Sequence, residues 1–127
     1  MRRVVQLSSW GAYLVAGTGG VLGSNDVEGI LAELPGLALT QLRPTSFYTV
    51  MFGFIGMIKA GGTIGVNYLV TNCVAFVHPR DIASAAAEEL TTPAAPGRYV
   101  RYIASDERTA DEVTQVLGAT IGQPDLR

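Results

Sequence analysis

The chain has 127 residues, of which 48% are hydrophobic, and its formal net charge is -2. This length predicts one small domain spanning residues 1–127, with enough apolar material to form a core. Nine basic residues against eleven acidic ones leave no broad positive surface, which argues against a nucleic-acid partner.

Cys73 is the only cysteine, which excludes an internal disulfide and a zinc site built from cysteines. We therefore expect no bound metal and a reduced, cytoplasmic setting. The basic start Met1-Arg2-Arg3 precedes an apolar run too short for a signal peptide. The apolar stretch Phe47–Ile58 is shorter than the roughly 20 residues that a membrane-spanning helix needs. It predicts a buried helix, or one covered by a partner, rather than a membrane anchor.

The first third of the chain reads as strand, helix and strand. Residues 3–8 are apolar without alternation, which is typical of a strand covered on both faces. After a glycine-rich loop at 9–23, Ser24 or Asn25 can cap a helix over 26–34. Its apolar stripe consists of Val27, Ile30, Leu31 and Leu34. A second strand over 37–42 completes a parallel βαβ unit.

The remaining expected elements alternate between helix and strand. Pro79 suits the first turn of a helix, and Thr109 with Glu112 forms a capping box. In chain order we expect a helix at 46–60, an irregular segment with a short strand at 64–68, a strand at 74–77, a helix at 79–90, an edge strand at 98–104 and a helix from 109 through 117.

Gly17, Gly20 and Gly23 have the Gly-x-x-Gly-x-x-Gly spacing with which dinucleotide-binding proteins hold a pyrophosphate. The context is unfavourable, because the acidic residue expected about 20 positions further on is replaced by an apolar segment. We interpret the segment as a flexible loop near the site, and the alternative of a true phosphate cradle stays open.

Five segments together resemble the C-terminal part of the NmrA-like family, a group of atypical short-chain dehydrogenases/reductases. They are Val4–Ser9, Leu42-Arg43-Pro44, Phe76–Ala83, Gly97–Glu107 and the capped helix leading into Ile121–Leu126. The resemblance implies an α/β fold, a partial Rossmann-like doubly wound parallel sheet that lacks its N-terminal dinucleotide-binding strands. It also implies NAD(P)H-dependent reduction of small electrophiles such as quinones, or redox sensing of NAD(P) without chemistry. A fragment of this kind is expected to be inactive alone, with doubtful binding of NAD(P)H.

The resemblance also suggests where ligands bind. Ser8 and Ser9 end the first strand, where doubly wound sheets place their ligand crevice. In the family, serines here and the backbone after the proline, at Pro44 and Thr45, lie beside the nicotinamide. The candidate substrate pocket comprises Tyr13, Ser24, Phe47 and Tyr48.

The catalytic residues stay unassigned, because the Tyr–Lys pair of the wider reductase group is incomplete. Ser24 occupies the position, four residues before Glu28, where the family commonly has lysine or histidine. A serine hydroxyl neither carries a positive charge nor titrates near neutral pH. Tyr13 lacks a Tyr-x-x-x-Lys partner, since position 17 is glycine. These departures favour the alternative of a non-catalytic regulatory or interaction module.

Other polar residues have simpler interpretations. Arg43 is either a clamp on the loop or a ligand contact, and His78 is a packing residue rather than a base. Asp81 is expected to cap its helix. Arg98 and Arg101 are expected on one face of their strand, solvated or paired with Glu88 and Glu89. A small-molecule substrate is expected, together with self-association through the free edge of the first strand.

Overall fold

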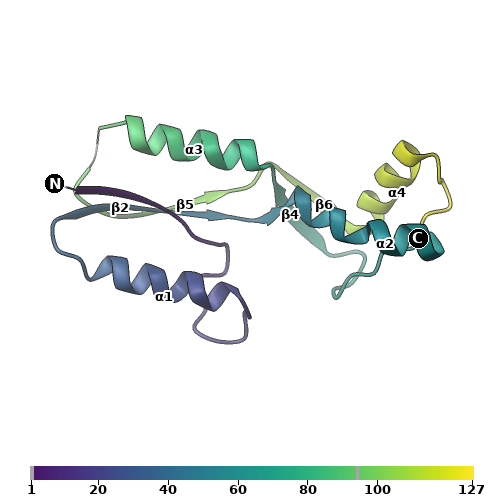
Figure 1. Cartoon of the computed structure of the whole chain (residues 1–127), viewed down its shortest axis with the longest axis horizontal. Helices are drawn as coiled ribbons and strands as arrows, with labels where there is room; N and C mark the ends of the chain where they lie inside the picture. Colours follow the sequence, from purple (N-terminus) through teal and green to yellow (C-terminus); the bar gives the residue numbers. More distant parts are fainter. Residues whose placement is uncertain (1, 94) are drawn as a thin grey trace.

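The computed structural model describes residues 2–93 and 95–127, which form two small sheets with their helices (Figure 1). The first sheet contains β1 (Arg2–Leu7), β2 (Leu37–Pro44) and β5 (Gly97–Ile103) in the order β1-β2-β5. All three strands are parallel, with Val4 opposite Leu39 and Gln41 opposite Val100. The predicted parallel βαβ unit is therefore confirmed, and so is the edge position of β5.

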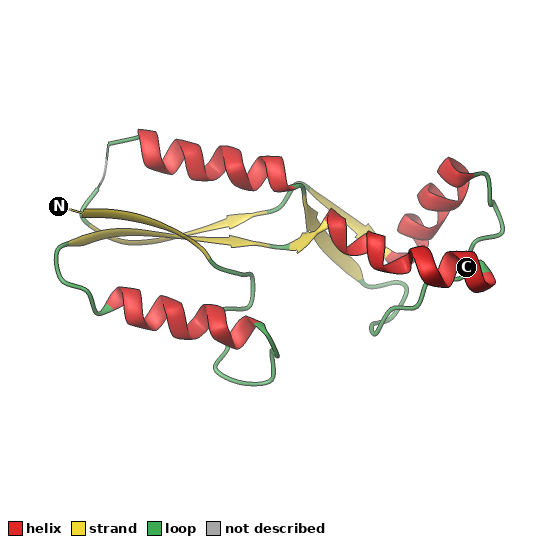
Figure 2. Ribbon diagram, viewed as in Figure 1, coloured by secondary structure: helices red, strands yellow, loops and turns green. Residues whose placement is uncertain are grey.

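Two helices cover opposite faces of this sheet, as Figure 2 shows for α1 (Val21–Ala32) and α3 (Pro79–Thr91). Helix α1 begins before the predicted start at Asp26, and Gly20 precedes it without a side-chain cap. The predicted cap residue Asn25 lies inside the helix. Its amide instead donates to the carbonyl of Ala12 at 2.6 Å, which fastens the glycine-rich loop to α1.

The second sheet contains β3 (Ser46–Phe47), β4 (Cys73–Val77) and β6 (Asp106–Thr109). Strand β4 pairs in parallel with β3 and antiparallel with β6, a strand that the sequence did not predict. Helix α4 (Ala110–Ile121) follows β6, and its capping box between Thr109 and Glu112 is confirmed.

The apolar segment after β3 is neither one continuous helix nor buried, so of the two predicted alternatives only cover by a partner stays a prediction. It forms a 3-10 helix, η1 (Tyr48–Phe54), followed by the short helix α2 (Ile55–Gly61). Phe52 is 71% exposed, and neither helix buries a residue fully. Residues 64–68 are irregular rather than a strand. Among the described residues, no helix is both long and apolar enough to cross a membrane.

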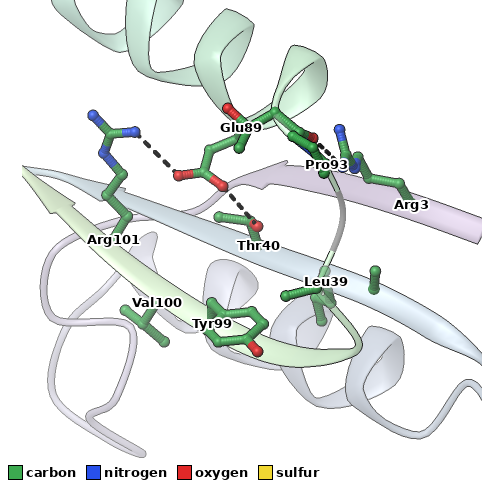
Figure 3. A pocket seen from close by; sticks show the side chains of 11 residues that line it. Arg3, Leu39, Thr40, Glu89, Pro93, Tyr99, Val100 and Arg101 are labelled. Atoms are coloured by element: carbon green, nitrogen blue, oxygen red, sulfur yellow. Dashed lines mark hydrogen bonds and ion pairs between the residues drawn. The ribbon is translucent and has the colours of Figure 1, made fainter.

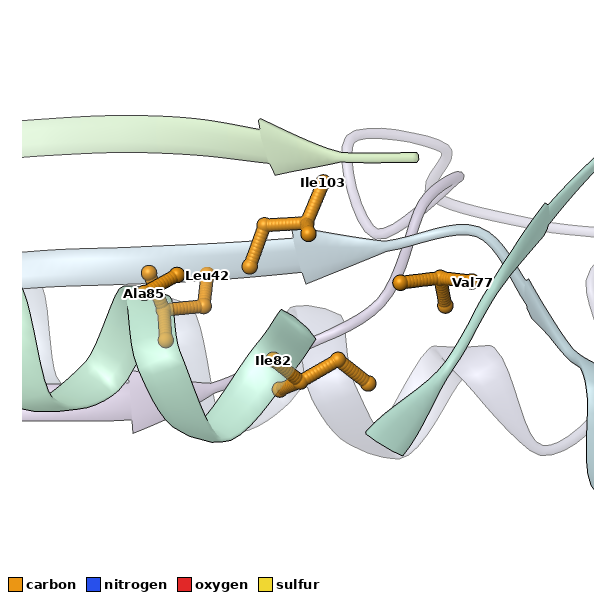
Figure 4. Close-up of a cluster of buried hydrophobic side chains, with 5 residues drawn as sticks. All are labelled: Leu42, Val77, Ile82, Ala85 and Ile103. Atoms are coloured by element: carbon orange, nitrogen blue, oxygen red, sulfur yellow. The ribbon is translucent and has the colours of Figure 1, made fainter. Parts of the chain in front are cut away.

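One hydrophobic cluster joins the two sheets beneath α3 (Figure 4). Its members are Leu42 of β2, Ile103 of β5 and Val77 of β4, together with Ile82 and Ala85 of α3. Burying each of the larger side chains stabilises the fold by about 1.5–3 kcal/mol. The cluster therefore fixes the carboxyl ends of β2 and β5 next to the second sheet.

The start of α3 is held by His78, whose Nδ1 accepts from the backbone N–H of Arg80 at 3.1 Å. Pro79 occupies the first turn, as predicted. The expectation that Asp81 caps this helix is wrong, because its carboxylate instead accepts from the hydroxyl of Ser105. His78 is thus a structural residue, and it fills the capping role.

Candidate functional site

The loop after β1 runs alongside the end of β2, at the carboxyl edge of the parallel sheet. The backbone N–H of Ser8 donates to Leu42 at 2.8 Å, and that of Trp10 donates to Pro44 at 2.9 Å. The two segments that the resemblance assigned to the cofactor, Ser8-Ser9 and Pro44-Thr45, therefore meet. Ligands of open α/β sheets bind at this edge.

A buried carboxylate lies directly beneath this edge, on the inward face of α1. Glu28 is 2% exposed and accepts from Ser8 Oγ at 2.5 Å. Arg43 donates to the same carboxylate from Nε at 2.9 Å and from Nη2 at 2.6 Å. Arg98 of β5 adds a cation with its Nη2 3.6 Å from Glu28 Oε2. One carboxylate thus connects α1 with all three strands of the first sheet.

The electrostatics keep this pair ionised. Burial alone would raise the pKa of Glu28, but hydrogen bonds from Arg43 and Ser8 outweigh it and leave the pKa below its ordinary value. The hydrogen bonds to Glu28 raise the pKa of Arg43 above its ordinary value, against the effect of burial. Arg43 therefore holds a carboxylate of α1 and the Tyr102 hydroxyl, and not the loop carbonyls that its predicted structural role named.

Two tyrosines flank the Arg43 guanidinium. Its carbon lies 5.8 Å from the ring centre of Tyr13 and 5.6 Å from that of Tyr102. Its Nη1 also donates to the Tyr102 hydroxyl at 2.8 Å. These contacts give the loop residue Tyr13 a defined place over the buried cation.

The serine and threonine hydroxyls assigned to the cofactor have protein partners. Ser9 Oγ donates to the carbonyl of Trp10 at 3.1 Å, and Thr45 Oγ1 donates to that of Ile103 at 3.3 Å. Because these donors are used, each hydroxyl oxygen has only acceptor lone pairs left for a ligand.

The predicted substrate-pocket residues are spread over different environments. Phe47 lines an apolar groove with Leu7 and Leu90, while Tyr48 stacks on Phe76 with ring centres 5.5 Å apart. Burial and the nearby Asp106 raise the pKa of Tyr48. Ser24 is half-buried in the first turns of α1.

The glycine motif lies between β1 and α1. Gly17 adopts a positive φ of 78°, Gly20 is the residue before α1, and Gly23 lies within that helix. A Cβ atom at Gly20 or Gly23 would meet nothing within 4 Å, so the packing does not require glycine there. Both interpretations of the motif, loop and cradle, remain predictions.

The two arginines of β5 point to opposite faces, because residues three apart in a strand do so. Arg101 pairs with Glu89 at 3.1 Å, as Figure 3 shows, and with Glu88 at 2.7 Å, both as expected. Arg98 instead donates to Gln41 at 2.9 Å on the α1 side. The prediction that both lie on one face is wrong.

Sequence reasoning missed a cavity of about 470 Å³ between the two sheets. Tyr102 at the end of β5 contributes to its lining, as does Trp10 from the loop after β1. The other lining residues are Thr45, Ser46, Cys73, Val74, Ala75, Ala104 and Glu107. The sequence signal was the tryptophan directly after the Ser8-Ser9 pair. In residues 2–93 and 95–127, no three His, Cys, Asp or Glu side chains gather closely enough to hold a metal ion.

Comparison with solved structures finds the same fold in several chains, two of which were solved with bound NAD. MoeE5, solved with UDP-glucuronic acid and NAD, matches 95% of this chain with a TM-score of 0.67 and 19% identity. DesIV, a dTDP-glucose 4,6-dehydratase from Streptomyces venezuelae solved with NAD, matches 94% with a TM-score of 0.68 and 22% identity. A UDP-N-acetylglucosamine 4-epimerase from Methanobrevibacter ruminantium M1 matches 96% with a TM-score of 0.70 and 14% identity.

The chain spans about half the length of these structures, since the matches cover 48%, 44% and 47% of them. No family model matches the sequence. No curated protein matches it either. At these identities the likeness concerns the fold alone, and the chain has part of a Rossmann-like α/β fold with a parallel sheet.

Proposed function

We propose that this chain is the substrate-side half of an NmrA-like, NAD(P)H-dependent reductase of small electrophiles such as quinones. One observation carries the proposal: the Ser8–Trp10 segment is hydrogen-bonded along Leu42–Pro44 at the carboxyl edge of a parallel sheet. The fold neighbours MoeE5 and DesIV were both solved with NAD, which supports the same cofactor class here.

In this proposal the nicotinamide end of the cofactor lies against Ser9, Pro44 and Thr45. Bound NAD(P)H would supply the hydride, while these residues bind and orient the ring. Glu28 and Arg43 hold the strand ends behind them in place. A reduced, cytoplasmic setting, in which Cys73 stays a thiol, belongs to the same proposal.

Calorimetric titration of the 127-residue chain with NADPH and NADH tests this assignment. We expect dissociation constants in the millimolar range, because the chain offers the nicotinamide end of the site without an established pyrophosphate cradle. Binding at micromolar strength would instead assign the cradle to Gly17–Gly23. No detectable binding at several millimolar cofactor would contradict the proposal that the cofactor binds at this edge of the sheet.

A second candidate, a non-catalytic module that senses the NAD(P) redox state, is favoured by Ser24 in place of lysine or histidine. Following NADPH absorbance with a quinone present separates the two candidates. Oxidation that rises in proportion to chain concentration supports the reductase and would overturn the expectation that the chain is inactive alone. Binding that distinguishes NADPH from NADP+ without any oxidation supports the sensor.

A further inference from the structure

The outward face of α1 carries an apolar stripe that no described part of the chain covers. Val27, Ile30 and Leu34 are 45%, 64% and 50% exposed, and their spacing places them on one side of the helix. Glu28 points the other way and pairs with Arg43 in the first sheet. Figure 2 shows this sheet on one side of α1 and no other described helix or strand against its far side. The stripe therefore faces away from the fold.

The same stripe has room for a closely packed neighbour. Gly23 lies four residues before Val27, so it continues the stripe toward the start of α1. A Cβ atom at Gly23 would meet nothing within 4 Å, so no side chain of the described residues fills the space beside it. From Gly23 to Leu34 the stripe is about 16 Å long, at about 1.5 Å per residue. A second helix has space to pack along it.

Two carboxylates lie along one edge of this stripe. Asp26 and Glu33 are seven residues apart, about two helical turns, so they lie on the same side of α1. Both residues are exposed, and within residues 2–93 and 95–127 neither carboxylate forms an ion pair. The sequence 21–34 contains no lysine or arginine. This edge of the stripe is therefore negatively charged and lacks a counter-charge.

These charges distinguish between the kinds of molecule that cover an apolar stripe. The α1 helix of a second copy would bring only further carboxylates, in whichever direction the two helices ran. A membrane rich in anionic lipids would be repelled by the same edge. A helix with its own apolar stripe and with lysine or arginine along one edge would cover the aliphatic side chains and neutralise both carboxylates.

We propose that the outward face of α1 is a docking surface for an amphipathic helix of a partner protein, with basic residues along one edge of its apolar stripe. The partner's aliphatic side chains pack against Val27, Ile30 and Leu34, and its cations pair with Asp26 and Glu33. The proposal does not depend on cofactor binding, because the stripe faces away from the first sheet and its carboxyl edge.

Synthetic peptides of about 20 residues, long enough to form a helix, test this surface. One peptide has a leucine stripe with lysine along one edge, a second has glutamate in place of lysine, and a third has the composition of the first in scrambled order. Fluorescence anisotropy of each labelled peptide, titrated with the 127-residue chain, measures its affinity. We expect the lysine peptide to bind about tenfold more tightly than the other two. Equal affinity of the lysine peptide and either of the others would overturn the proposal.

Variants of the chain show whether the peptide binds at this face. Ile30→Lys is expected to weaken binding of the lysine peptide about tenfold, because it places a positive charge in the stripe. Val116→Lys on α4 is the matched control and should bind as the parent does, since Val116 is similarly exposed at 61%. Asp26→Asn combined with Glu33→Gln is expected to bring the lysine and glutamate peptides within about threefold of each other. Unaltered binding in Ile30→Lys and in the double variant, with native circular dichroism, would contradict the surface.

Light scattering separates a partner protein from a second copy. We expect Ile30→Lys to leave the size of any oligomers unchanged, because self-association is expected at the free edge of β1. If Ile30→Lys made the oligomers of the parent chain smaller, the stripe would belong to a contact between copies, and the proposal would be overturned.

Discussion

Glu28 is the residue on which the candidate site depends most. Its carboxylate lies inside α1 and takes hydrogen bonds from Ser8 and from two nitrogens of Arg43. Because these partners sit at the ends of β1 and β2, the charge pair sets the spacing between the two segments assigned to the cofactor. Removing one partner of such a buried ion pair lowers the free energy of unfolding, because the other charge stays buried without a counter-charge.

We therefore expect Glu28→Gln to lower the free energy of unfolding by about 3–5 kcal/mol, as for other broken buried pairs. Urea denaturation followed by circular dichroism measures this change. Glu33→Gln, on the exposed end of the same helix, is the matched control and is expected to stay within about 0.5 kcal/mol of the parent. Equal stabilities for the two variants would show that the pair does not hold the sheet edge.

The same carboxylate predicts how stability depends on pH. Burial would raise the pKa of Glu28, but hydrogen bonds from Arg43 and Ser8 leave it lower in the folded chain than the ordinary value of 4.5. Such a group stabilises the fold fully above its unfolded pKa, and the contribution disappears as the pH falls through the folded pKa. The stability difference between parent and Glu28→Gln should therefore be full at neutral pH and shrink in acid. A difference that is constant with pH would contradict the ionised pair.

Helix α4 shows what the sequence predicts well at the scale of an element. The capping box is confirmed, with Glu112 N–H donating to Thr109 Oγ1 at 3.2 Å and Thr109 N–H donating to Glu112 at 2.8 Å. We expect Thr109→Ala to destabilise the chain by about 0.5–2 kcal/mol. Thermal denaturation provides the measurement, with Thr120→Ala near the other end of α4 as the control. A larger loss for Thr120→Ala would mean that the cap contributes little.

Helix α1 shows where sequence patterns fail. The periodicity of Val27, Ile30 and Leu34 predicted a buried stripe, yet these residues are 45%, 64% and 50% exposed, and Glu28 lies inward instead. Charged residues are almost never fully buried unless paired, and the partner Arg43 belongs to another strand. Periodicity within one helix cannot report such a pairing. The strands β1 and β2 were predictable because their apolar runs need no distant partner.

In the candidate site, too, features set by neighbouring residues could be predicted, and features set by distant segments could not. The Ser8-Ser9 pair was singled out because it ends a strand of a parallel sheet, whereas Leu42-Arg43-Pro44, now the end of β2, was singled out only by the family resemblance. Their assignment to the cofactor stays a prediction. The cavity at Trp10 and Tyr102 was not identifiable, because it depends on how the second sheet packs against the first. That packing comes from the cluster that joins Val77 to Leu42, Ile103 and α3, residues that lie far apart in the sequence.

At the scale of the whole molecule, the first sheet has two open edges of different character. In the described residues, β1 has a partner strand only on its β2 side, and Leu7 is 59% exposed there. The edge at β5 carries Arg98 and Arg101, charged residues of the kind that oppose strand addition. We propose that copies of this chain associate through β1, next to the apolar groove that Phe47, Ala86 and Leu90 line.

Light scattering of the purified chain tests this association. We expect oligomers that become smaller in Leu7→Lys, because a charge in the apolar groove opposes packing of a second copy. Val100→Lys on the β5 edge is the matched control and should leave the oligomers unchanged. A monodisperse monomer in the parent chain would refute association altogether. If only Val100→Lys made the oligomers smaller, the contact between copies would lie at the β5 edge instead.

We propose that this chain carries the nicotinamide side of an NAD(P) site. Saturation-transfer NMR with NADH and the 127-residue chain tests this proposal, because it reports which protons of a weakly bound ligand touch the protein. We expect the nicotinamide protons to receive more saturation than the adenine protons, and Thr45→Val to reduce this transfer. Saturation strongest at the adenine, or equal transfer in Thr45→Val, would contradict it.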